Sequence, residues 1–504
     1  MAEVGSLLLT MLEVLAALFI FALGLAAASV LVMYIVDRSQ TQSTIRRNYP
    51  VVGRARYFFE HLGEFFRQYF FAMDREEMPF NRAQRSWAYR AAKNVDNTVA
   101  FGSTRDLRPE GTVMFVNCAF PTLDEDAVPP SPVKYGPYCE TPYTTASFFN
   151  ISGMSFGAIS TPAVCALSRG AQASGIWMNT GEGGLSPYHL EGGCDVVFQI
   201  GTAKYGVRDA NGQLDDDRLR EIAAHENVRM FELKLSQGAK PGKGGILPGA
   251  KVTEEIAGIR GIPVGEDSIS PNRHPEIDSV EDLLDMIAHV RRVTGKPTGF
   301  KAVIGAYGWL ENLFAEINRR GIESAPDFIV VDSGDGGTGA APMPLMDDVG
   351  LPIKESLPLV SDLLIRHRLD DRIRLGCSGK RINPTEVAWA LCIGADFVVS
   401  ARGFMFALGC IQALQCNRNT CPTGITTHNR KLQHGLDPAD KSVRVANYAR
   451  NMVKEVGVIA HSCGVPEPRL LRRYHARVVC KDGFTQALDD LYPLPEPTIV
   501  ATGT

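Results

Sequence analysis

The sequence predicts an α/β protein, a (β/α)8 barrel of the TIM type with an N-terminal transmembrane helix and helical N- and C-terminal extensions. Eight short β-rich runs recur from about Phe148 onward, and most are followed by a plausible helix. Gly-rich or polar tips follow nearly every run, as expected at the active-site rim of a barrel. An uncharged apolar segment near the start is long enough to cross a bilayer.

The apolar segment runs from Val14 to Val36 without a charge, so we take residues 1–36 as a transmembrane anchor. No Lys or Arg precedes it, whereas several arginines follow. The positive-inside rule therefore predicts a single-pass protein of the cell membrane with its catalytic body in the cytoplasm. The arginines are Arg38, Arg46, Arg47, Arg54 and Arg56.

A cleaved signal peptide is the alternative interpretation of this segment. Such a peptide has a basic start, a shorter apolar core and a small-residue cleavage site. Here the basic start is missing, the apolar run is longer and no clear cleavage site follows. These differences favour a retained anchor.

Residues 37–147 are predicted to form a juxtamembrane helix and a collar. From Tyr57 to Met73 the aromatic and leucine residues follow helical spacing, with charged residues on the opposite face. This helix either lies on lipid headgroups or packs against the barrel, and the periodicity supports both. The polar, Pro-rich stretch from Arg75 to Tyr143 is typical of turns and connections, not of a core.

Residues 148–430 are assigned to the barrel, whose eight runs we number in chain order. An open doubly wound sheet is the alternative, but its ligands gather at one switch point, whereas here the polar tips recur after nearly every run. The runs are FFNISGMSFG, WMNTGEGG, VVFQIGT, MFELKLSQG, TGFKAVIGA, DFIVVDSGDGG, RIRLGCSGK and DFVVSARGF.

A long excursion follows the fourth run, and such excursions on a barrel rim are usually functional. A helix then resumes with Asp278 or Ser279 as its N-cap. Residues 431–504 are predicted to be a helical extension with a Pro-rich tail.

Charge and cysteine content narrow the function classes. The formal net charge is -4 and no basic face is evident, so nucleic acid is not expected as a partner. The 11 cysteines are scattered along a long chain, which argues against a disulfide scaffold and for reduced thiols.

Polar residues at the ends of the runs are the candidates for the site, because those ends face the rim. Any one of them taken alone could equally serve a structural ion pair inside the barrel. They are Ser155, Asn179, Glu182, Gln199, Glu232, Lys234, Gln237, Lys301, Asp332 and Asp335.

The seventh and eighth runs end in Ser378 to Lys380 and in Ser400 to Gly403. Barrels commonly bind phosphate with the loops after these two strands, which fits a phosphorylated cofactor, although plain turn chemistry also explains the glycines. The loop from Ser333 to Pro342 lacks the Gly-Lys-Ser/Thr ending of a Walker loop, so ATP binding is not indicated.

Three cysteines, Cys410, Cys416 and Cys421, lie just past the eighth run, and the last is followed by proline. Three thiolates suit a three-iron cluster, but the spacing is wider than the usual ferredoxin run, so buried structural thiols remain an alternative. Zinc would need a fourth ligand, for which His428 is a candidate.

The motifs of the barrel resemble the FMN-binding synthase domain of glutamate synthase over roughly Phe148 to Asn429. They appear in the family's order. The motifs are GMSFGAIS, NTGEGG, KLSQGAKPGKGGILPG, ISPNRHPEIDSVEDL, SGDGGTGAAP and GCIQALQCNRNTCPTGITT.

The resemblance implies FMN, a 2-oxo acid such as 2-oxoglutarate with ammonia as substrates, and a [3Fe-4S] cluster on Cys410, Cys416 and Cys421. It also implies roles for single residues. Lys301 would be the cation at the substrate, with Glu232 and Gln237 lining the site, and the residues near the cofactor would be Met154, Ser155, Gln199, Ser378, Gly379, Arg402 and Gly403.

The chain departs from the family pattern at two motifs. It reads CysSerGly at Cys377 to Gly379 where the family usually has Asp-Gly-Gly, and GlyLysGlyGly at Gly242 to Gly245 where the family has Gly-Glu-Gly-Gly. No N-terminal nucleophilic cysteine of an amidotransferase and no strand-linked G-x-G-x-x-G nicotinamide motif is evident. We therefore expect ammonia from outside and electrons from a ferredoxin-like or membrane-linked donor.

Two further functions compete with a synthase. One is an FMN oxidoreductase of the same fold acting on another substrate, such as a 2-hydroxy acid. That reaction needs a histidine base, and only His189 or His274 on loops could supply it. The other is a non-catalytic, membrane-anchored partner.

Overall fold

The computed structural model describes residues 2–497 of the chain, and the predicted tail beyond residue 497 lies outside the described residues. The chain divides into two compact units, Met1–Ala83 and Gln84–Thr504.

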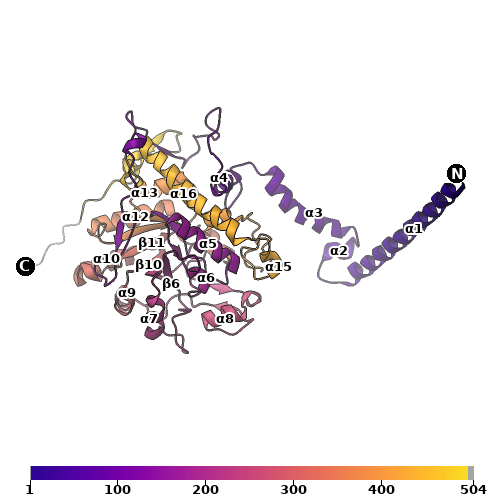
Figure 1. Cartoon of the computed structure of the whole chain (residues 1–504), viewed down its shortest axis with the longest axis horizontal. Helices are drawn as coiled ribbons and strands as arrows, with labels where there is room; N and C mark the ends of the chain where they lie inside the picture. Colours follow the sequence, from indigo (N-terminus) through magenta and orange to yellow (C-terminus); the bar gives the residue numbers. More distant parts are fainter. Residues whose placement is uncertain (1, 498–504) are drawn as a thin grey trace, which may run out of the picture. The chain divides into compact units, whose positions relative to one another are not determined.

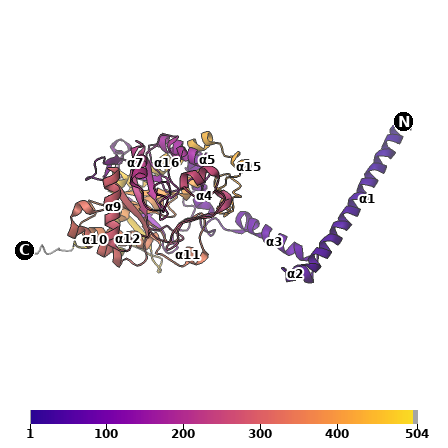
Figure 2. The ribbon, with the colours of Figure 1, turned by 90° about the horizontal axis from the view of Figure 1, so that it is seen from below.

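The first unit is helical and includes the predicted membrane segment (Figure 2). Among residues 2–497, one helix, Gly5–Ser39, is long and apolar enough to cross a membrane, with a mean hydropathy of 2.6. The predicted amphipathic helix forms α3 and continues into a π-helix. The elements are α1 (Ala2–Ser39), α2 (Thr44–Asn48), α3 (Gly53–Phe66) and the π-helix η1 (Arg67–Phe71).

The second unit is built around a closed barrel of eight parallel strands, which confirms the predicted fold. Each predicted run overlaps one strand of the barrel, and β13 pairs with β4 to close it. The strands are β4 (Phe149–Ile151), β5 (Met178–Asn179), β6 (Val196–Ile200), β7 (Val228–Lys234), β10 (Thr298–Val303), β11 (Phe328–Asp332), β12 (Arg374–Ser378) and β13 (Phe397–Ser400).

Helices follow the strands and cover the outside of the barrel (Figure 1). After β7 the chain makes the predicted excursion, which contains the antiparallel pair β8 (Ile246–Leu247) and β9 (Ser268–Ile269) and the helix α8 (Glu254–Arg260). The other helices of the barrel are α5 (Thr161–Ser174), α6 (Pro187–Leu190), α7 (Asp216–Ala224), α9 (Val280–Thr294), α10 (Gly308–Arg320), α11 (Met343–Asp347), α12 (Ile353–Arg366), α13 (Pro384–Ile393) and α14 (Arg402–Leu408).

The boundaries of α9 show how local sequence sets these elements. Ser279, one of the two predicted N-caps, accepts a hydrogen bond at its Oγ from the N–H of Asp282, at 3.1 Å. The Asp282 carboxylate accepts from the N–H of Ser279 in return, which completes a capping box. The helix ends at Gly295, whose positive φ of 69° suits a glycine C-cap.

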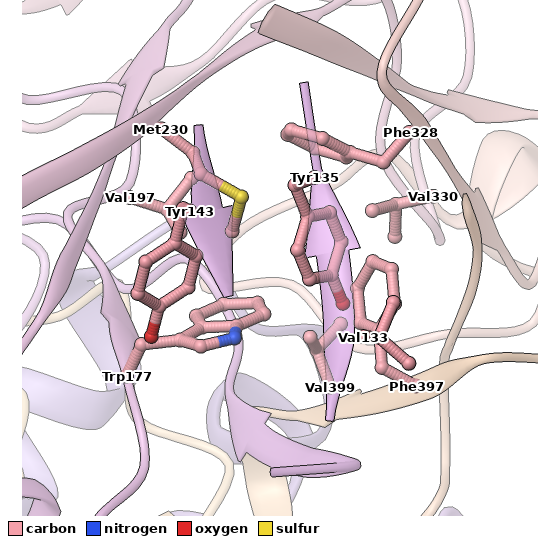
Figure 3. Close-up of a cluster of buried hydrophobic side chains, with 10 residues drawn as sticks. All are labelled: Val133, Tyr135, Tyr143, Trp177, Val197, Met230, Phe328, Val330, Phe397 and Val399. Atoms are coloured by element: carbon pink, nitrogen blue, oxygen red, sulfur yellow. The ribbon is translucent and has the colours of Figure 1, made fainter. Parts of the chain in front are cut away.

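The collar closes the amino-terminal end of the barrel. Its hairpin of β2 (Val133–Tyr135) and β3 (Tyr143–Thr145) places Tyr135 against Phe328 and Phe397, with ring centroids 6.1 and 5.7 Å apart (Figure 3). Tyr135 is fully buried. The prediction that this stretch forms connections and not core is therefore wrong at its end, where three apolar side chains, Val133, Tyr135 and Tyr143, enter the core.

Both ends of the second unit add structure outside the barrel. The helical extension consists of α4 (Arg82–Ala92) before it and of α15 (Arg430–Gln433), α16 (Pro438–Ser462) and α17 (Leu488–Leu491) after it, with α16 packed along α5. The collar and the C-terminal extension also share a small antiparallel sheet, in which β1 (Val113–Phe115) pairs with β14 (Ala476–Val479) and β14 with β15 (Thr485–Ala487).

Candidate active site

Two adjoining cavities lie at the carboxyl ends of the barrel strands, where the rim residues were predicted. They share lining residues, which are Gly153, Gln199, Lys234, Gln237, Gly337, Ala401 and Arg402. One cavity extends toward Met154, Ser155, the β7–α9 excursion and Cys416. The other extends toward Lys301, Asp332, Ser378 and Gly379.

Lys301, in the middle of β10, pairs with Asp332 at the end of β11. Its Nζ lies 3.0 Å from Asp332 Oδ2, and both side chains are almost wholly buried. Burial alone would lower the pKa of Lys301, but the carboxylates of Asp332 and Glu232 outweigh it and raise that pKa. Lys301 is therefore held as a cation inside the cavity.

Glu232 lies in β7, beside Gln199 of β6 in the register of the two strands. Its Oε1 accepts hydrogen bonds from Gln199 Nε2 at 2.6 Å and from Asn179 Nδ2 at 2.9 Å. Burial raises the pKa of Glu232, and Lys301 opposes that rise. Glu232 does not itself line either cavity, but Gln199 links it to both.

Lys234 and Gln237 form a second polar group at the end of β7. Lys234 Nζ lies 2.9 Å from Glu182 Oε2 and donates to Gln237 Oε1 at 2.7 Å. The amide of Gln237 in turn donates to Thr338 Oγ1 at 3.1 Å. Burial would raise the pKa of Glu182, but Lys234 and Lys240 lower it, so the carboxylate stays charged.

Three buried cations of the excursion also line this space, and the candidate list did not include them. Lys251 donates from Nζ to the carbonyls of Ala158 and Cys416, at 2.7 and 3.3 Å. Arg260 reaches the carbonyl of Phe156 at 3.2 Å. The third is Lys240. Its burial and the nearby Lys234 lower its pKa to about 8. The length of the excursion is the sequence feature that pointed to additional site residues. The sequence does not show which residues of the excursion fold back over the barrel.

Ser378 at the end of β12, Gly379 just after it and Arg402 at the start of α14 line the smaller cavity. Gly379 has a positive φ of 95°, and a Cβ there would meet Ser333 Cβ at 2.4 Å, so this turn requires glycine. Gly403 does not line either cavity. It packs against α16, where a Cβ would meet Tyr448 Oη at 2.1 Å.

The loop after β4 places Met154 and Ser155 in the cavity wall. The neighbouring Gly181 has a positive φ of 66°, and a Cβ there would lie 2.5 Å from the Ser155 amide nitrogen. Close approach of these two loops therefore depends on glycine in the motif NTGEGG.

The three predicted cluster cysteines follow α14. Cys416 lines the larger cavity, and Arg402 Nη1 lies 3.7 Å from its Sγ. Burial raises the pKa of Cys410, and the other two thiols add to that rise, so the three are close enough to influence one another. Within residues 2–497, however, no group of three or more His, Cys, Asp or Glu side chains is placed to hold a metal ion.

The structure therefore gathers most of the predicted site residues around one space. Eight of them line the two cavities together with Cys416, and Glu232 lies one hydrogen bond behind. Gly403, Cys410 and Cys421 do not line them. The eight are Met154, Ser155, Gln199, Gln237, Lys301, Ser378, Gly379 and Arg402.

A sequence model described as the conserved region in glutamate synthase matches residues 123–466 of this chain. The chain belongs to the glutamate synthase family. It is a glutamate synthase-like oxidoreductase, and membership of the family supports FMN as its cofactor.

The relatives in this family match either nearly the whole chain or about two thirds of it. The glutamate synthase large subunit-like protein YerD of Bacillus subtilis (strain 168) is 38% identical, and the match covers 94% of this chain and 98% of that protein. The archaeal-type glutamate synthase (NADPH) of Thermotoga maritima is 35% identical over 64% of this chain, which spans 60% of that synthase.

Proposed function

We propose that this chain is a membrane-anchored, FMN-dependent enzyme that reductively aminates a 2-oxo acid, with 2-oxoglutarate and ammonia forming glutamate. The observation that carries the proposal is the buried Lys301, paired with Asp332 and facing the cavity between glycine-rich strand tips. A buried, fixed cation is suited to hold an anionic substrate and to stabilise charge that develops on it.

FMN would span the two adjoining cavities. Gly153 and Gly337 line both, and their backbone packs closely on neighbouring side chains, because a Cβ at Gly153 would lie 2.9 Å from Asn179 Oδ1 and one at Gly337 would lie 3.1 Å from Arg402 Nε. Ser378, Gly379 and Arg402 would hold the phosphate, while Met154, Ser155 and Gln199 would border the ring. The predicted phosphate contact of Gly403 has less support, since that residue packs under Tyr448. When bound, FMN would supply the two electrons of the reduction as a hydride.

The residues of the chain would bind and orient the substrate. Lys301 would pair with a carboxylate of the 2-oxo acid, and the Gln237 amide would donate a hydrogen bond beside it. Lys234, held by Glu182 at 2.9 Å, adds a second cation on the same side. The Glu232 carboxylate accepts a hydrogen bond from the Gln199 amide and would thereby hold Gln199 in place in the cavity wall behind the substrate.

A [3Fe-4S] cluster on Cys410, Cys416 and Cys421 is the finer part of the proposal. Lys251 lies beside this loop, where its Nζ donates a hydrogen bond to the Cys416 carbonyl at 3.3 Å, and a nearby cation favours thiolates. The thiols are not gathered tightly enough to form a metal site in the described residues, so loading would require their loop to draw together. His428 as a fourth ligand has no support, because its Nε2 bonds with the carbonyl of Gly157.

The electron donor and the membrane belong to the proposal as well. We propose that α1 crosses the cell membrane once, because it carries no charge from Val14 to Val36 and is followed by arginines. The barrel would then face the cytoplasm, where a ferredoxin-like or membrane-linked donor would reduce it. Ammonia would be free or delivered by another chain.

An oxidase of 2-hydroxy acids has less support from the structure. Neither His189 nor His274 lines the cavities, and burial lowers the pKa of each to about 4. A histidine base would need to reach the substrate from one of these positions. A non-catalytic partner is disfavoured by the family to which the chain belongs.

The test is reoxidation of the reduced protein. Full-length protein in detergent is reduced anaerobically with dithionite, and 2-oxoglutarate and ammonium are added singly and together. Reoxidation with glutamate formation only when both are present is the expected result. Lys301→Gln should lose it, whereas Lys134→Gln, at an exposed lysine of β2, should keep it. A flavin that stays reduced with both substrates would refute the synthase.

A further inference from the structure

The turn between α1 and α3 is built around one buried carboxylate. Asp37 is fully buried and accepts hydrogen bonds from Arg46 Nη2 and Arg54 Nη2, each at 2.8 Å, and from the amide of Val51 at 3.0 Å. Ser43 Oγ and Tyr57 Oη add a hydrogen bond of 2.8 Å across the same turn. These contacts fix the start of α3 at the end of the apolar helix.

The helix that leaves this turn has an apolar face without cover. Every side chain of α3 and η1 is exposed or half-buried, and Gly53 is the only buried residue of α3. Aromatic side chains remain largely exposed, with Phe58 at 62%, Phe59 at 64% and Phe70 at 67%. Helical spacing gathers the apolar residues on one side of α3 and η1. They are Ala55, Phe58, Phe59, Leu62, Phe65, Phe66, Tyr69 and Phe70.

The charges at the start of this helix are mainly positive. The stretch from residue 37 to residue 56 contains five arginines against one aspartate, a formal charge of +4. Two of the arginines, Arg46 and Arg54, pair with Asp37, and the others, Arg38, Arg47 and Arg56, lie close to the same turn in the sequence. Basic residues beside a membrane span are attracted to anionic lipid headgroups.

We propose that α3 and η1 form an interfacial helix that lies on the anionic leaflet, with its aromatic face in the boundary between headgroups and acyl chains. An exposed apolar face rich in aromatics, polar residues opposite it and a basic turn at its start are the features of such a helix. The Asp37 turn would hold it at the depth where α1 leaves the bilayer. The proposal rests on the proposed membrane span of α1.

The test measures lipid contact in the full chain by introduced tryptophans. Phe58→Trp places the probe on the apolar face, and Glu60→Trp, two residues on, places it on the opposite face as the matched control. Leu23→Trp reports on the middle of α1. Each variant is reconstituted in vesicles with and without bromine-labelled acyl chains, and the emission of the four native tryptophans is subtracted using the unmutated chain.

The expected result is that bromine removes most of the added emission of Phe58→Trp and Leu23→Trp and little of that of Glu60→Trp. Phosphatidylglycerol in the vesicles should increase the quenching of Phe58→Trp over phosphatidylcholine alone, and high salt should reduce this difference. No effect of phosphatidylglycerol would overturn the anionic preference.

Two outcomes separate this proposal from the membrane span. If Leu23→Trp is quenched and Phe58→Trp is blue-shifted but unquenched, the aromatic face is covered by protein and the interfacial helix is refuted while the span stands. If neither probe is quenched, both the span and the interfacial helix fail.

Discussion

Lys301 Nζ and Asp332 Oδ2 meet at 3.0 Å across the neighbouring strands β10 and β11, with the side chains 7% and 6% exposed. Breaking such a pair on one side leaves a buried charge without its partner, whereas removing both charges does not. The pair therefore allows stability to be separated from catalysis.

We predict that Lys301→Met loses roughly a hundredfold or more in kcat/KM for the 2-oxo acid and about 3 kcal/mol of stability. The double variant Lys301→Met with Asp332→Asn should recover much of the stability and none of the activity. Chemical denaturation and anaerobic turnover measure the two effects. Wild-type turnover in either variant would rule out Lys301 as the substrate cation.

The pH dependence of the reaction should respond to Glu232. Its carboxylate helps to raise the pKa of Lys301, so Glu232→Gln should lower that pKa. Loss of the Lys301 proton would then begin at lower pH, and the alkaline limb of the kcat/KM profile should move to lower pH. Glu316→Gln, at a carboxylate on α10 that pairs with Arg319 and Arg320, is the control and should leave the limb in place.

The cysteine loop gives a spectroscopic prediction. Serine at Cys410, Cys416 or Cys421 should remove the electron paramagnetic resonance signal of an oxidised three-iron cluster and the protein-bound iron, while flavin absorbance is kept. Cys463→Ser, at a thiol that is 7% exposed where Cys421 is 8% exposed, is the matched control. Equal iron content in the control and in the three variants would argue for structural thiols.

Gly403 separates packing from cofactor binding. A Cβ at this position would meet Tyr448 Oη at 2.1 Å and Ser400 Oγ at 2.7 Å. Gly403→Ala should therefore cost roughly 1–3 kcal/mol through overpacking, and Tyr448→Phe in the same chain should recover part of it. Flavin affinity of the double variant should stay near that of Tyr448→Phe alone. A large loss of affinity at full stability would instead support the phosphate role.

Buried histidines predict acid sensitivity. Burial lowers the pKa of His189 from 6.5 to about 4, so the folded protein binds this proton less readily than the unfolded chain. The neutral His189 therefore stabilises the folded protein fully above about pH 6.5. This contribution to the free energy of unfolding is lost as the pH falls toward 4, by up to roughly 3 kcal/mol. Denaturation at pH 7 and pH 5 should show a smaller loss for His189→Gln than for the unmutated chain. An equal loss would contradict this assignment.

The barrel was predictable because its signals are local. Each strand is a short apolar run with a polar tip. The start of α9 is marked by Ser279, which forms a capping box within four residues of sequence. The rim candidates followed from the same rule, since Lys301 and Asp332 stand in strands whose carboxyl ends must meet.

What could not be predicted depends on contacts between distant segments. Arg260 reaches the site only because the excursion folds back over the barrel, and nothing in its neighbours specifies that path. Tyr135 lies in a Pro-rich stretch and becomes core through contact with Phe328 and Phe397, nearly 200 and more than 250 residues away. Strands of three or four residues, such as β1, give too little periodicity to recognise.

The pairing of β1 with β14 and of β13 with β4 has a consequence for synthesis of the chain. The small sheet cannot form until Val478 has been synthesised to pair with Val113. The barrel cannot close until Val398 has been synthesised to pair with Phe149. While the ribosome is still at work, β4 therefore presents an unpaired parallel edge, which is the kind of surface that aggregates. If α1 enters the membrane first, each nascent chain is held apart at its own insertion point, and tethering would limit encounters between these edges until the barrel closes.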